Sequence, residues 1–590
     1  MKHLNLKCLF FLCLLTVART LTAADTTSVY IYQLNHYYTL QALSALTLDR
    51  PNSYLKAMYQ NRSNIYAKPS DQTRIKQENL VDARFLYKFK ESIMSGPAVR
   101  WYTLSDEQHS SQNDYRNTRL GLAGMYRKKV TLTGSTGYFN EQRQSLEDQG
   151  WYANMEFMRP NNQVFTPFIR WQYDKTPERS NYTTDNRFNI ITPFEQDIFN
   201  HFTVNFKETR REYYIDPANP GRTEVRTTTN REIKNSFSYR LPLHVRLRYN
   251  VRFSSATDYL NFFVADSSAN RKRDSYQFQN QIFLSRLKNN LHLRGGFSID
   301  QNQDKSSANR DEIRLPADYK YSRTTLSALS SFRFSKTDSL SMRYQVSLLH
   351  FDTPDSNNTD DKDELSYVFN PQLSLALSPY LRWNLSGQVY LHHLIYLHSS
   401  RSGQNHWNRV YTIRSNLSLS IPAKLTWSST QSISSNYFIY DYEDSAFINV
   451  SSRIFRSLYI DQSVDYFLSP GWSLKYRISG RFEDDGLLDW DLFIQEKYSD
   501  RIQVSQEFLI NHRGRYFQIY AGPVNSRRWF YQNTPTTDKT LIQYVYRNGL
   551  SIGCQFRTNI RIKYTLEAIH QKNQKRVYNQ NGYLQINFIL

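Results

Sequence analysis

The sequence predicts an all-β protein: a transmembrane up-and-down antiparallel β-barrel of about 26 strands (22–26), with short periplasmic turns and longer extracellular loops. Three observations predict this fold: long runs of alternating polar and apolar residues, tight turns at a steady spacing, and a polar composition rich in aromatic residues. The 590 residues include 44 Tyr, 35 Phe and 9 Trp, yet mean hydropathy is −0.66. Averaging over alternating strands hides a lipid-facing band, and the aromatic residues suit its two interfacial girdles.

The alternating runs are long. In residues 243–253 one face of an extended chain carries the apolar side chains of Leu243, Val245, Leu247, Tyr249, Val251 and Phe253, and the other carries polar or basic ones. The pattern recurs at residues 472–482 and 560–568. Strands of soluble sandwiches usually have about 5–6 residues, whereas runs of about 10 are what a tilted strand needs to cross a bilayer.

Tight turns recur about 43–48 residues apart from Pro242 onward, with a longer hydrophilic segment midway between them. A β-propeller has a similar repeat, but glycine is scarce (19 residues) and each interval holds two long strands. The first turn is predicted near Ser95-Gly96-Pro97, which leaves about 25 strands from Leu80 onward. Since such barrels have an even strand number, a further strand is expected in Thr27–Leu40 or Leu55–Ala67. Residues 37–66 have weak helical character, from Leu40, Leu43 and Leu46.

The N-terminus predicts export. Residues 1–24 read as a cleaved signal peptide, with Lys2 and Lys7 before the apolar run Leu9–Val17. Residues 25–76 are expected to be an N-terminal periplasmic or plug-like segment that can contain the first strand, and residues 77–590 the outer-membrane barrel. Removing the signal peptide changes the formal net charge from +21 to +18. The predicted location is the bacterial outer membrane.

The C-terminus resembles the insertion signal of outer-membrane barrel proteins. One face of the last predicted strand carries Gly582, Leu584, Ile586, Phe588 and Leu590, although the final residue is Leu590 where that signal usually has Phe. The resemblance implies that the barrel-assembly machinery inserts the chain into a membrane of outer-membrane lipid and lipopolysaccharide.

The basic excess is predicted to lie partly in the lumen. The residues expected to point inward are Arg246, Arg248, Arg252, Lys475, Arg477, Arg481, Arg561 and Lys563. On the lipid face each would cost about 2–4 kcal/mol near the bilayer midplane. A basic lumen raises the local concentration of anions. The alternative is a water-filled wall whose charges are balanced by Asp and Glu from neighbouring strands.

No catalytic residue, metal site or cofactor is predicted. The sequence has no nucleophile elbow, HExxH motif, phosphate-binding glycine loop or Cys/His metal spacing, so an enzyme is not expected. Basic composition also fits nucleic-acid binding, but export and the dispersion of the charge argue against that partner.

The predicted architecture resembles large outer-membrane β-barrels of Gram-negative type, without identifying one family. The first function expected is a porin-like pore or conduit for solutes, with anionic solutes as candidates. The second is a scaffold or sleeve around a lumen-filling partner protein, because the strand count resembles the lipopolysaccharide-assembly barrel and the sleeve barrel of electron-transfer conduits. The third is a surface adhesin or receptor acting through its loops.

Overall fold

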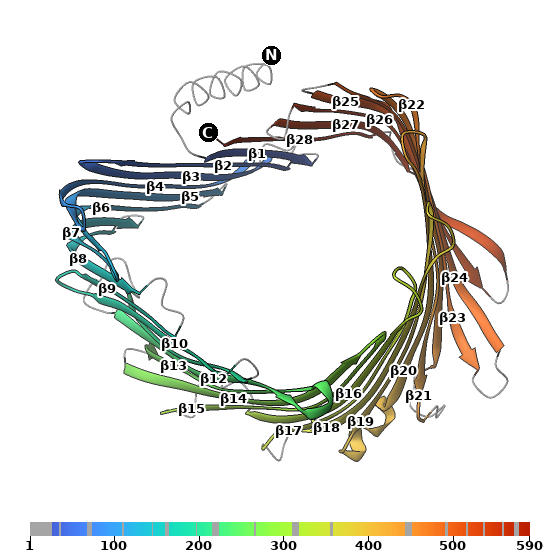
Figure 1. Ribbon diagram of the computed structural model, residues 1–590, viewed down its shortest axis with the longest axis horizontal. Helices are drawn as coiled ribbons and strands as arrows, with labels where there is room; N and C mark the ends of the chain where they lie inside the picture. The colour runs from blue at the N-terminus through green and yellow to red at the C-terminus, as the bar shows by residue number, and fades with distance from the viewer. Residues whose placement is uncertain are drawn as a thin grey trace.

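The described residues of the computed structural model form one sheet of 28 strands. The structure describes residues 26–34, 37–67, 73–108, 111–143, 146–159, 164–195, 198–214, 223–264, 267–309, 318–354, 358–442, 451–489, 494–514, 517–534, 537–556, 560–571 and 577–589. Each strand pairs antiparallel with its neighbours in chain order, and β1 pairs antiparallel with β28, so the sheet closes into a barrel. Figure 1 shows the strands as one continuous wall around the centre.

The strands have the following bounds: β1 Thr26–Leu34, β2 Tyr37–Arg50, β3 Ser53–Ala67, β4 Thr73–Lys90, β5 Ile93–Gln108, β6 Ser111–Arg127, β7 Thr131–Arg143, β8 Leu146–Met158, β9 Phe165–Lys175, β10 Ser180–Glu195, β11 Ile198–Tyr214, β12 Thr223–Leu241, β13 Val245–Val264, β14 Ser267–Lys288, β15 Leu291–Ala308, β16 Tyr319–Arg333, β17 Ser339–Asp352, β18 Lys362–Ala376, β19 Leu381–Tyr396, β20 His406–Ile421, β21 Leu425–Tyr440, β22 Arg453–Ser469, β23 Trp472–Asp489, β24 Ile494–Arg513, β25 Phe517–Thr534, β26 Thr537–Phe556, β27 Ile560–Gln571 and β28 Val577–Ile589. Two short 3-10 helices, η1 Pro242–His244 and η2 Ser399–Gln404, lie in connections. No helix in these ranges is long and apolar enough to cross a membrane.

The strands are longer than a bilayer requires. They run from 9 residues in β1 to 22 in β14, and a 22-residue strand spans roughly 70 Å at about 3.3 Å per residue. Even with the usual tilt, such a strand exceeds the apolar band of about 25 Å. The longest strands therefore extend beyond the membrane.

Short turns gather at one end of the barrel, which we call the short-turn end. Examples are Pro51-Asn52 between β2 and β3, and Asn289-Asn290 between β14 and β15. The other end, the long-loop end, carries longer connections such as residues 397–405 between β19 and β20. The predicted asymmetry of turns and loops is thus confirmed, and the short-turn end is the periplasmic one.

The strand count exceeds the predicted 22–26. From β4 onward the chain has the expected number of strands, and the difference lies in residues 26–67, which form three strands of the wall. The described parts of the range 25–76, residues 26–34, 37–67 and 73–76, are therefore strands of the barrel wall, where a periplasmic or plug-like segment that can contain the first strand was expected. The leucines that suggested a helix divide between the two faces of β2: Leu40 and Leu46 share one parity and Leu43 has the other.

The turn predicted at Ser95-Gly96-Pro97 is wrong by a few residues. The chain turns at Glu91-Ser92, and Gly96 lies inside β5. A Cβ atom on Gly96 would lie 2.0 Å from the carbonyl oxygen of Phe85 in β4. This glycine therefore permits close approach of two strands and does not make a turn.

Candidate functional site: the lumen face

Register gives the wall one apolar and one polar face. One row of paired residues across β12–β19 is apolar throughout: Phe237, Tyr249, Ile282, Phe297, Leu326, Val346, Tyr367 and Leu391. The adjacent row, one residue away on each strand, is polar throughout: Ser236, Asn250, Gln281, Ser298, Thr325, Ser347, Ser366 and His392. A barrel in a bilayer turns its apolar face to lipid, so the polar face is the lumen.

The predicted basic residues share this polar face wherever the structure describes their side chains. Arg246, Arg248 and Arg252 alternate with the apolar row in β13. Lys475, Arg477 and Arg481 do so in β23, and Lys563 in β27. Arg561 lies in β27, but its side chain is outside the described ones.

The predicted insertion signal lies in and just beyond β28. Gly582, Leu584, Ile586 and Phe588 occupy alternate positions of this strand, and Ile586 pairs with Val29 of β1 and Ile560 of β27. Their side chains, and the whole of Leu590, are outside the described part of the chain.

An arginine arc lines the short-turn half of the lumen between β12 and β20. We define it as Arg240, Arg246, Arg248, Arg294, Arg333, Arg343, Arg382 and Arg414. On strands β12–β21 the acidic residues of the polar face, Glu224, Glu232, Asp258, Asp300, Asp304 and Glu364, lie at mid-height or nearer the long-loop end. Around the arc the polar face is mainly Ser, Thr, Asn and Gln.

Register concentrates this charge. Arg240 lies directly opposite Arg246, and the same row continues through Ser285 to Arg294 and through Leu329 to Arg343. Like charges directly opposite each other destabilise a sheet. Within the described ranges, no Asp or Glu oxygen lies within 4.0 Å of the cationic nitrogens of Arg246, Arg294 or Arg343. Anions from solution can therefore offset the charges of Arg246, Arg294 and Arg343.

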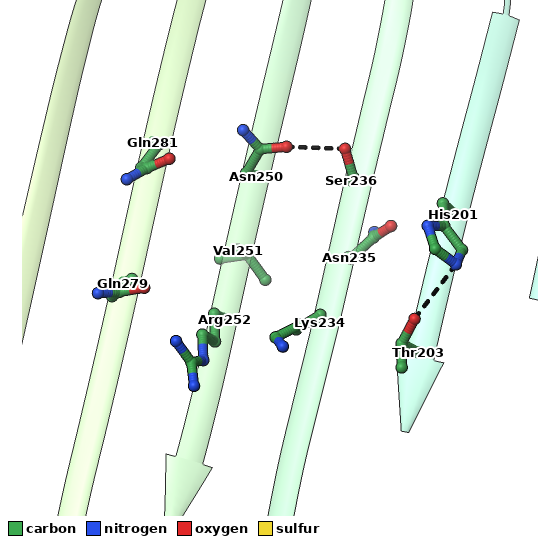
Figure 2. A pocket seen from close by; sticks show the side chains of 10 residues that line it. All are labelled: His201, Thr203, Lys234, Asn235, Ser236, Asn250, Val251, Arg252, Gln279 and Gln281. Carbon is green, nitrogen blue, oxygen red and sulfur yellow. Dashed lines mark hydrogen bonds between the residues drawn. The ribbon is translucent and has the colours of Figure 1, made fainter. Parts of the chain in front are cut away.

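A recess of about 250 Å³ lies next to this arc on its long-loop side, between β11 and β14 (Figure 2). Lys234 Nζ and Arg252 Nε both contact Glu232 Oε1, at 2.9 and 2.7 Å. Two cations thus share one carboxylate. Ser236 donates a hydrogen bond of 2.7 Å to Asn250 Oδ1 on the opposite strand, so the recess has one excess positive charge and neutral polar walls.

A second basic recess, of about 380 Å³, lies between β23 and β26. We call it the guanidinium recess and define it by Arg481, Glu483, Arg501, Gln503, Arg528, Phe530 and Gln543. Next to it, towards the short-turn end, a recess of about 300 Å³ is lined on the polar face by Arg477, Ser479, Ser505, Glu507, Ser526 and Arg547. The two recesses place basic side chains at successive heights along these strands.

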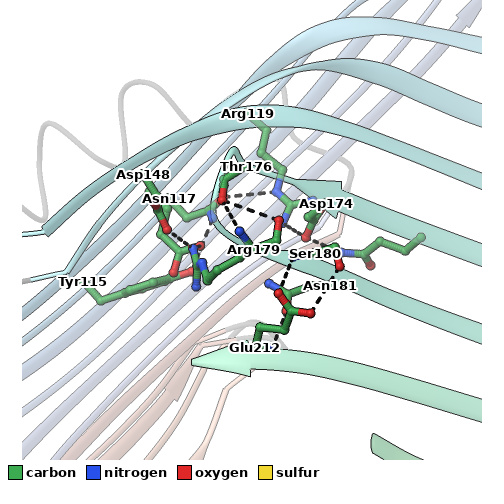
Figure 3. Close-up of polar contacts among 12 residues, drawn as sticks. Tyr115, Asn117, Arg119, Asp148, Asp174, Thr176, Arg179, Ser180, Asn181 and Glu212 are labelled. Atoms are coloured by element: carbon green, nitrogen blue, oxygen red, sulfur yellow. Dashed lines mark hydrogen bonds and ion pairs between the residues drawn. The ribbon is translucent and has the colours of Figure 1, made fainter. Parts of the chain in front are cut away.

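The sector from β6 to β10 is different, because its charges are balanced. Arg179, in the connection after β9, contacts Glu141 at 3.2 Å and Asp148 at 2.5 Å, and its side chain is 7% exposed. Arg119 makes two hydrogen bonds of 2.9 Å to Asp174. Figure 3 shows the side chains of Arg119, Asp174, Asp148 and Arg179 converging from several strands. In this sector the basic side chains are thus balanced by Asp and Glu, as in the alternative given above. In the sector β12–β20 the lumen face is basic.

Sequence reasoning missed most of the arc and all but one arginine of the guanidinium recess. Arg294, Arg343, Arg501 and Arg528 each stand between apolar residues or beside them in a strand pattern. That local signal identifies the face of the strand on which each arginine lies. Only the pairing between strands shows that these arginines lie near other arginines.

No family model matches the chain. No curated protein matches it either. Among solved structures it is similar to the copper transporter OprC, with 9% identity and a TM-score of 0.37 over 87% of this chain and 85% of that one. It is also similar to FauA, the alcaligin outer membrane receptor of Bordetella pertussis (9% identity, TM-score 0.40, 82% and 85% covered). A third is BauA, the ferric preacinetobactin receptor of Acinetobacter baumannii (9% identity, TM-score 0.42, 96% and 80% covered). At these TM-scores the similarity adds nothing to the barrel assignment, which rests on the strand pairing of this chain.

Proposed function

We propose that this barrel sits in the bacterial outer membrane and forms a conduit for anionic solutes. The single observation that carries the proposal is the arginine arc, in which Arg246, Arg294 and Arg343 share one register row and have no Asp or Glu oxygen within 4.0 Å among the described residues. A water-filled passage lined by charge of one sign attracts counter-ions and repels ions of its own sign. The arc supplies that charge at the periplasmic half.

The chemistry of arginine fits this role. A guanidinium group stays charged at every physiological pH and presents a planar fork to carboxylate or phosphate oxygens. Arg294 lies over the ring of Phe283, 4.3 Å from the centroid, which positions the side chain without neutralising it. The lining is therefore a set of fixed positive charges held among neutral polar groups.

The test is ion selectivity of the purified protein in planar bilayers. In a tenfold KCl gradient the reversal potential of the wild-type channel should lie closer to the equilibrium potential of chloride than to that of potassium. The double variant Arg246→Glu, Arg294→Glu should move that potential towards the potassium side, because two charges of the row change sign. The double variant Arg170→Gln, Glu156→Gln is the control: it also changes two polar-face side chains, but it removes an ion pair with a separation of 2.7 Å and keeps the net charge of the lumen, so it should leave selectivity nearly unchanged.

Three results would count against the proposal. A cation-selective wild type would overturn it, as would a selectivity that both variants shift equally. A silent barrel that co-purifies with a second protein from native membranes would replace it with the sleeve function. Insertion by the barrel-assembly machinery and contact with lipopolysaccharide belong to the same proposal, since both follow from an outer-membrane location.

A further inference from the structure

We infer that the guanidinium recess is a binding subsite for a small multivalent anion carrying phosphate or carboxylate groups. The inference deepens the proposed function and rests on it for the route by which such a solute arrives. The arginine arc explains selectivity for charge. The guanidinium recess explains where along the lumen a solute with two or more negative charges would pause.

Strand register brings the three arginines together at mid-height of the wall. Arg481 of β23 pairs with Gln503 of β24, which pairs with Arg528 of β25. Arg501 lies two residues from Gln503 on the same face of β24 and is paired with Glu483 and Phe530. The three guanidinium groups therefore come from neighbouring strands and line a single recess.

Each guanidinium group is positioned by a different neighbour. Arg528 Nη2 donates a hydrogen bond of 3.1 Å to Gln503 Oε1. The guanidinium carbon of Arg501 lies 5.3 Å from the centroid of the Phe530 ring. A neutral amide and an aromatic ring orient these two side chains and leave their charge in place.

The third arginine is held more loosely. Arg481 Nη1 lies 3.6 Å from Glu483 Oε1, and its side chain is 57% exposed. Its guanidinium carbon also lies 5.7 Å from the centroid of the Tyr459 ring. Glu483 is the one acidic side chain among the described residues that line the recess, so three positive charges face one negative charge. The excess of two charges suits a ligand with at least two negative charges.

The recess has the dimensions of a ligand site. Its volume of about 380 Å³ falls within the range of roughly 300–1,000 Å³ typical of small-molecule sites. Three guanidinium forks around that volume offer more donors than one monovalent ion can use. A solute with two phosphate or carboxylate groups can engage two or three of them together, which a chloride ion cannot.

The experiment is isothermal titration of the detergent-solubilised full chain with pyrophosphate and with citrate at 0.15 M salt. Pyrophosphate and citrate represent the two oxyanion classes, and the tighter ligand identifies the class preferred. Each of Arg481→Gln, Arg501→Gln and Arg528→Gln should weaken binding of the preferred probe about tenfold, or about 1.4 kcal/mol. Arg170→Gln, which removes the same charge from β9, outside both the arginine arc and the recess, is the matched control and should change affinity less than twofold.

Folding and geometry have their own controls. Heat-modifiable gel migration of every variant reports whether the barrel is intact. Arg501→Lys keeps the charge and loses the planar fork, so it should still weaken binding; an affinity equal to wild type would show that only net charge matters and would overturn the subsite. Equal losses for Arg170→Gln and the recess variants would overturn it too, as would absence of binding of both probes to the wild-type chain.

The outcome separates this inference from the proposed function. A chain that binds pyrophosphate or citrate through the recess but shows no anion selectivity in bilayers keeps the subsite and loses the conduit. A chloride-selective channel whose recess variants bind both probes as wild type does keeps the conduit and loses the subsite.

Discussion

Arg119 of β6 reaches over two strands to Asp174 of β9 and binds both of its carboxylate oxygens, at 2.9 Å each. The guanidinium group passes over the rings of Phe139 and Tyr152, 5.7 and 5.4 Å from their centroids. Both charged side chains are largely buried, at 14% and 13% exposed. The pair thus ties four strands together on the lumen face, where backbone pairing connects only neighbours.

Removing one partner of this pair should destabilise the barrel. Asp174→Asn leaves the Arg119 charge largely buried without its carboxylate, and a loss of about 2–4 kcal/mol in the free energy of unfolding is expected. Urea titration of the protein in detergent micelles, followed by tryptophan fluorescence, measures it. Glu156→Gln removes the partner of Arg170 in the same sector, where the side chains are 51% and 36% exposed, and should cost less than about 1 kcal/mol. Equal losses would mean that burial of the Arg119 pair contributes nothing.

The face of each strand could be predicted from sequence, but the rows between strands could not. Arg246 and Arg248 are flanked by Val245, Leu247 and Tyr249, so alternation alone places them opposite the apolar residues. That Arg246 shares a row with Arg294 depends on how β13, β14 and β15 are paired. A shift of one residue in the pairing register would move every side chain of the shifted strand to the other face. A shift of two residues would keep each side chain on its face, but Arg246 and Arg294 would no longer lie in one row.

The sequence predicts one N-terminal strand, in Thr27–Leu40 or Leu55–Ala67, where the structure has three, for a related reason. Residues 37–66 lack a clean run of alternation, Leu40, Leu43 and Leu46 have helical spacing, and the predicted turns do not include Pro51-Asn52. In the structure this turn joins β2 to β3, where Arg50 pairs with Ser53. Strand β1 pairs with β2 on one side and with β28 on the other, so β2 is held in the wall by a pairing that closes the barrel. Such long-range pairing has no local signal in the sequence.

Leu243 should destabilise the turn between β12 and β13. It has φ 61° in η1, between β12 and β13, and its side chain is 72% exposed. A left-handed conformation costs most L-residues about 1–2 kcal/mol, whereas Asn tolerates it better. Leu243→Asn should therefore raise the free energy of unfolding by about 0.5–1 kcal/mol, and Leu243→Val should lower it, as measured by urea titration. Asn289, with φ 51° in the next short turn, is the reciprocal control, since Asn289→Leu should be destabilising.

Asp338 should make the turn between β16 and β17 sensitive to acid. The backbone N–H of Ala376 and the hydroxyl of Ser335 donate to its carboxylate at 2.6 and 2.8 Å, and these hydrogen bonds lower the pKa of Asp338. Because the folded-state pKa lies below the unfolded value of about 3.9, the stabilisation is present above that value and is lost as the pH falls through the folded pKa. Asp338→Asn should thus be less stable than wild type at pH 7, and the difference should shrink at the most acid pH the barrel survives. A difference independent of pH between 7 and that limit would contradict a role for the ionised carboxylate.

Anion selectivity should weaken as the salt concentration rises, because salt screens the fixed charges of the arginine arc. The Debye length is about 10 Å at 0.1 M and about 3 Å at 1 M, whereas Arg246 and Arg294, two strands apart in the same row, have backbones roughly 10 Å apart. At low salt their fields overlap across the lining, and at high salt each acts alone. Reversal potentials measured with the same tenfold KCl gradient at low and at high mean concentration should therefore differ, with the chloride preference largest at low salt. Arg246→Gln should reduce the low-salt preference more than the high-salt one. A preference unchanged between the two concentrations would mean that a narrow steric filter sets selectivity and that the row of fixed charges does not.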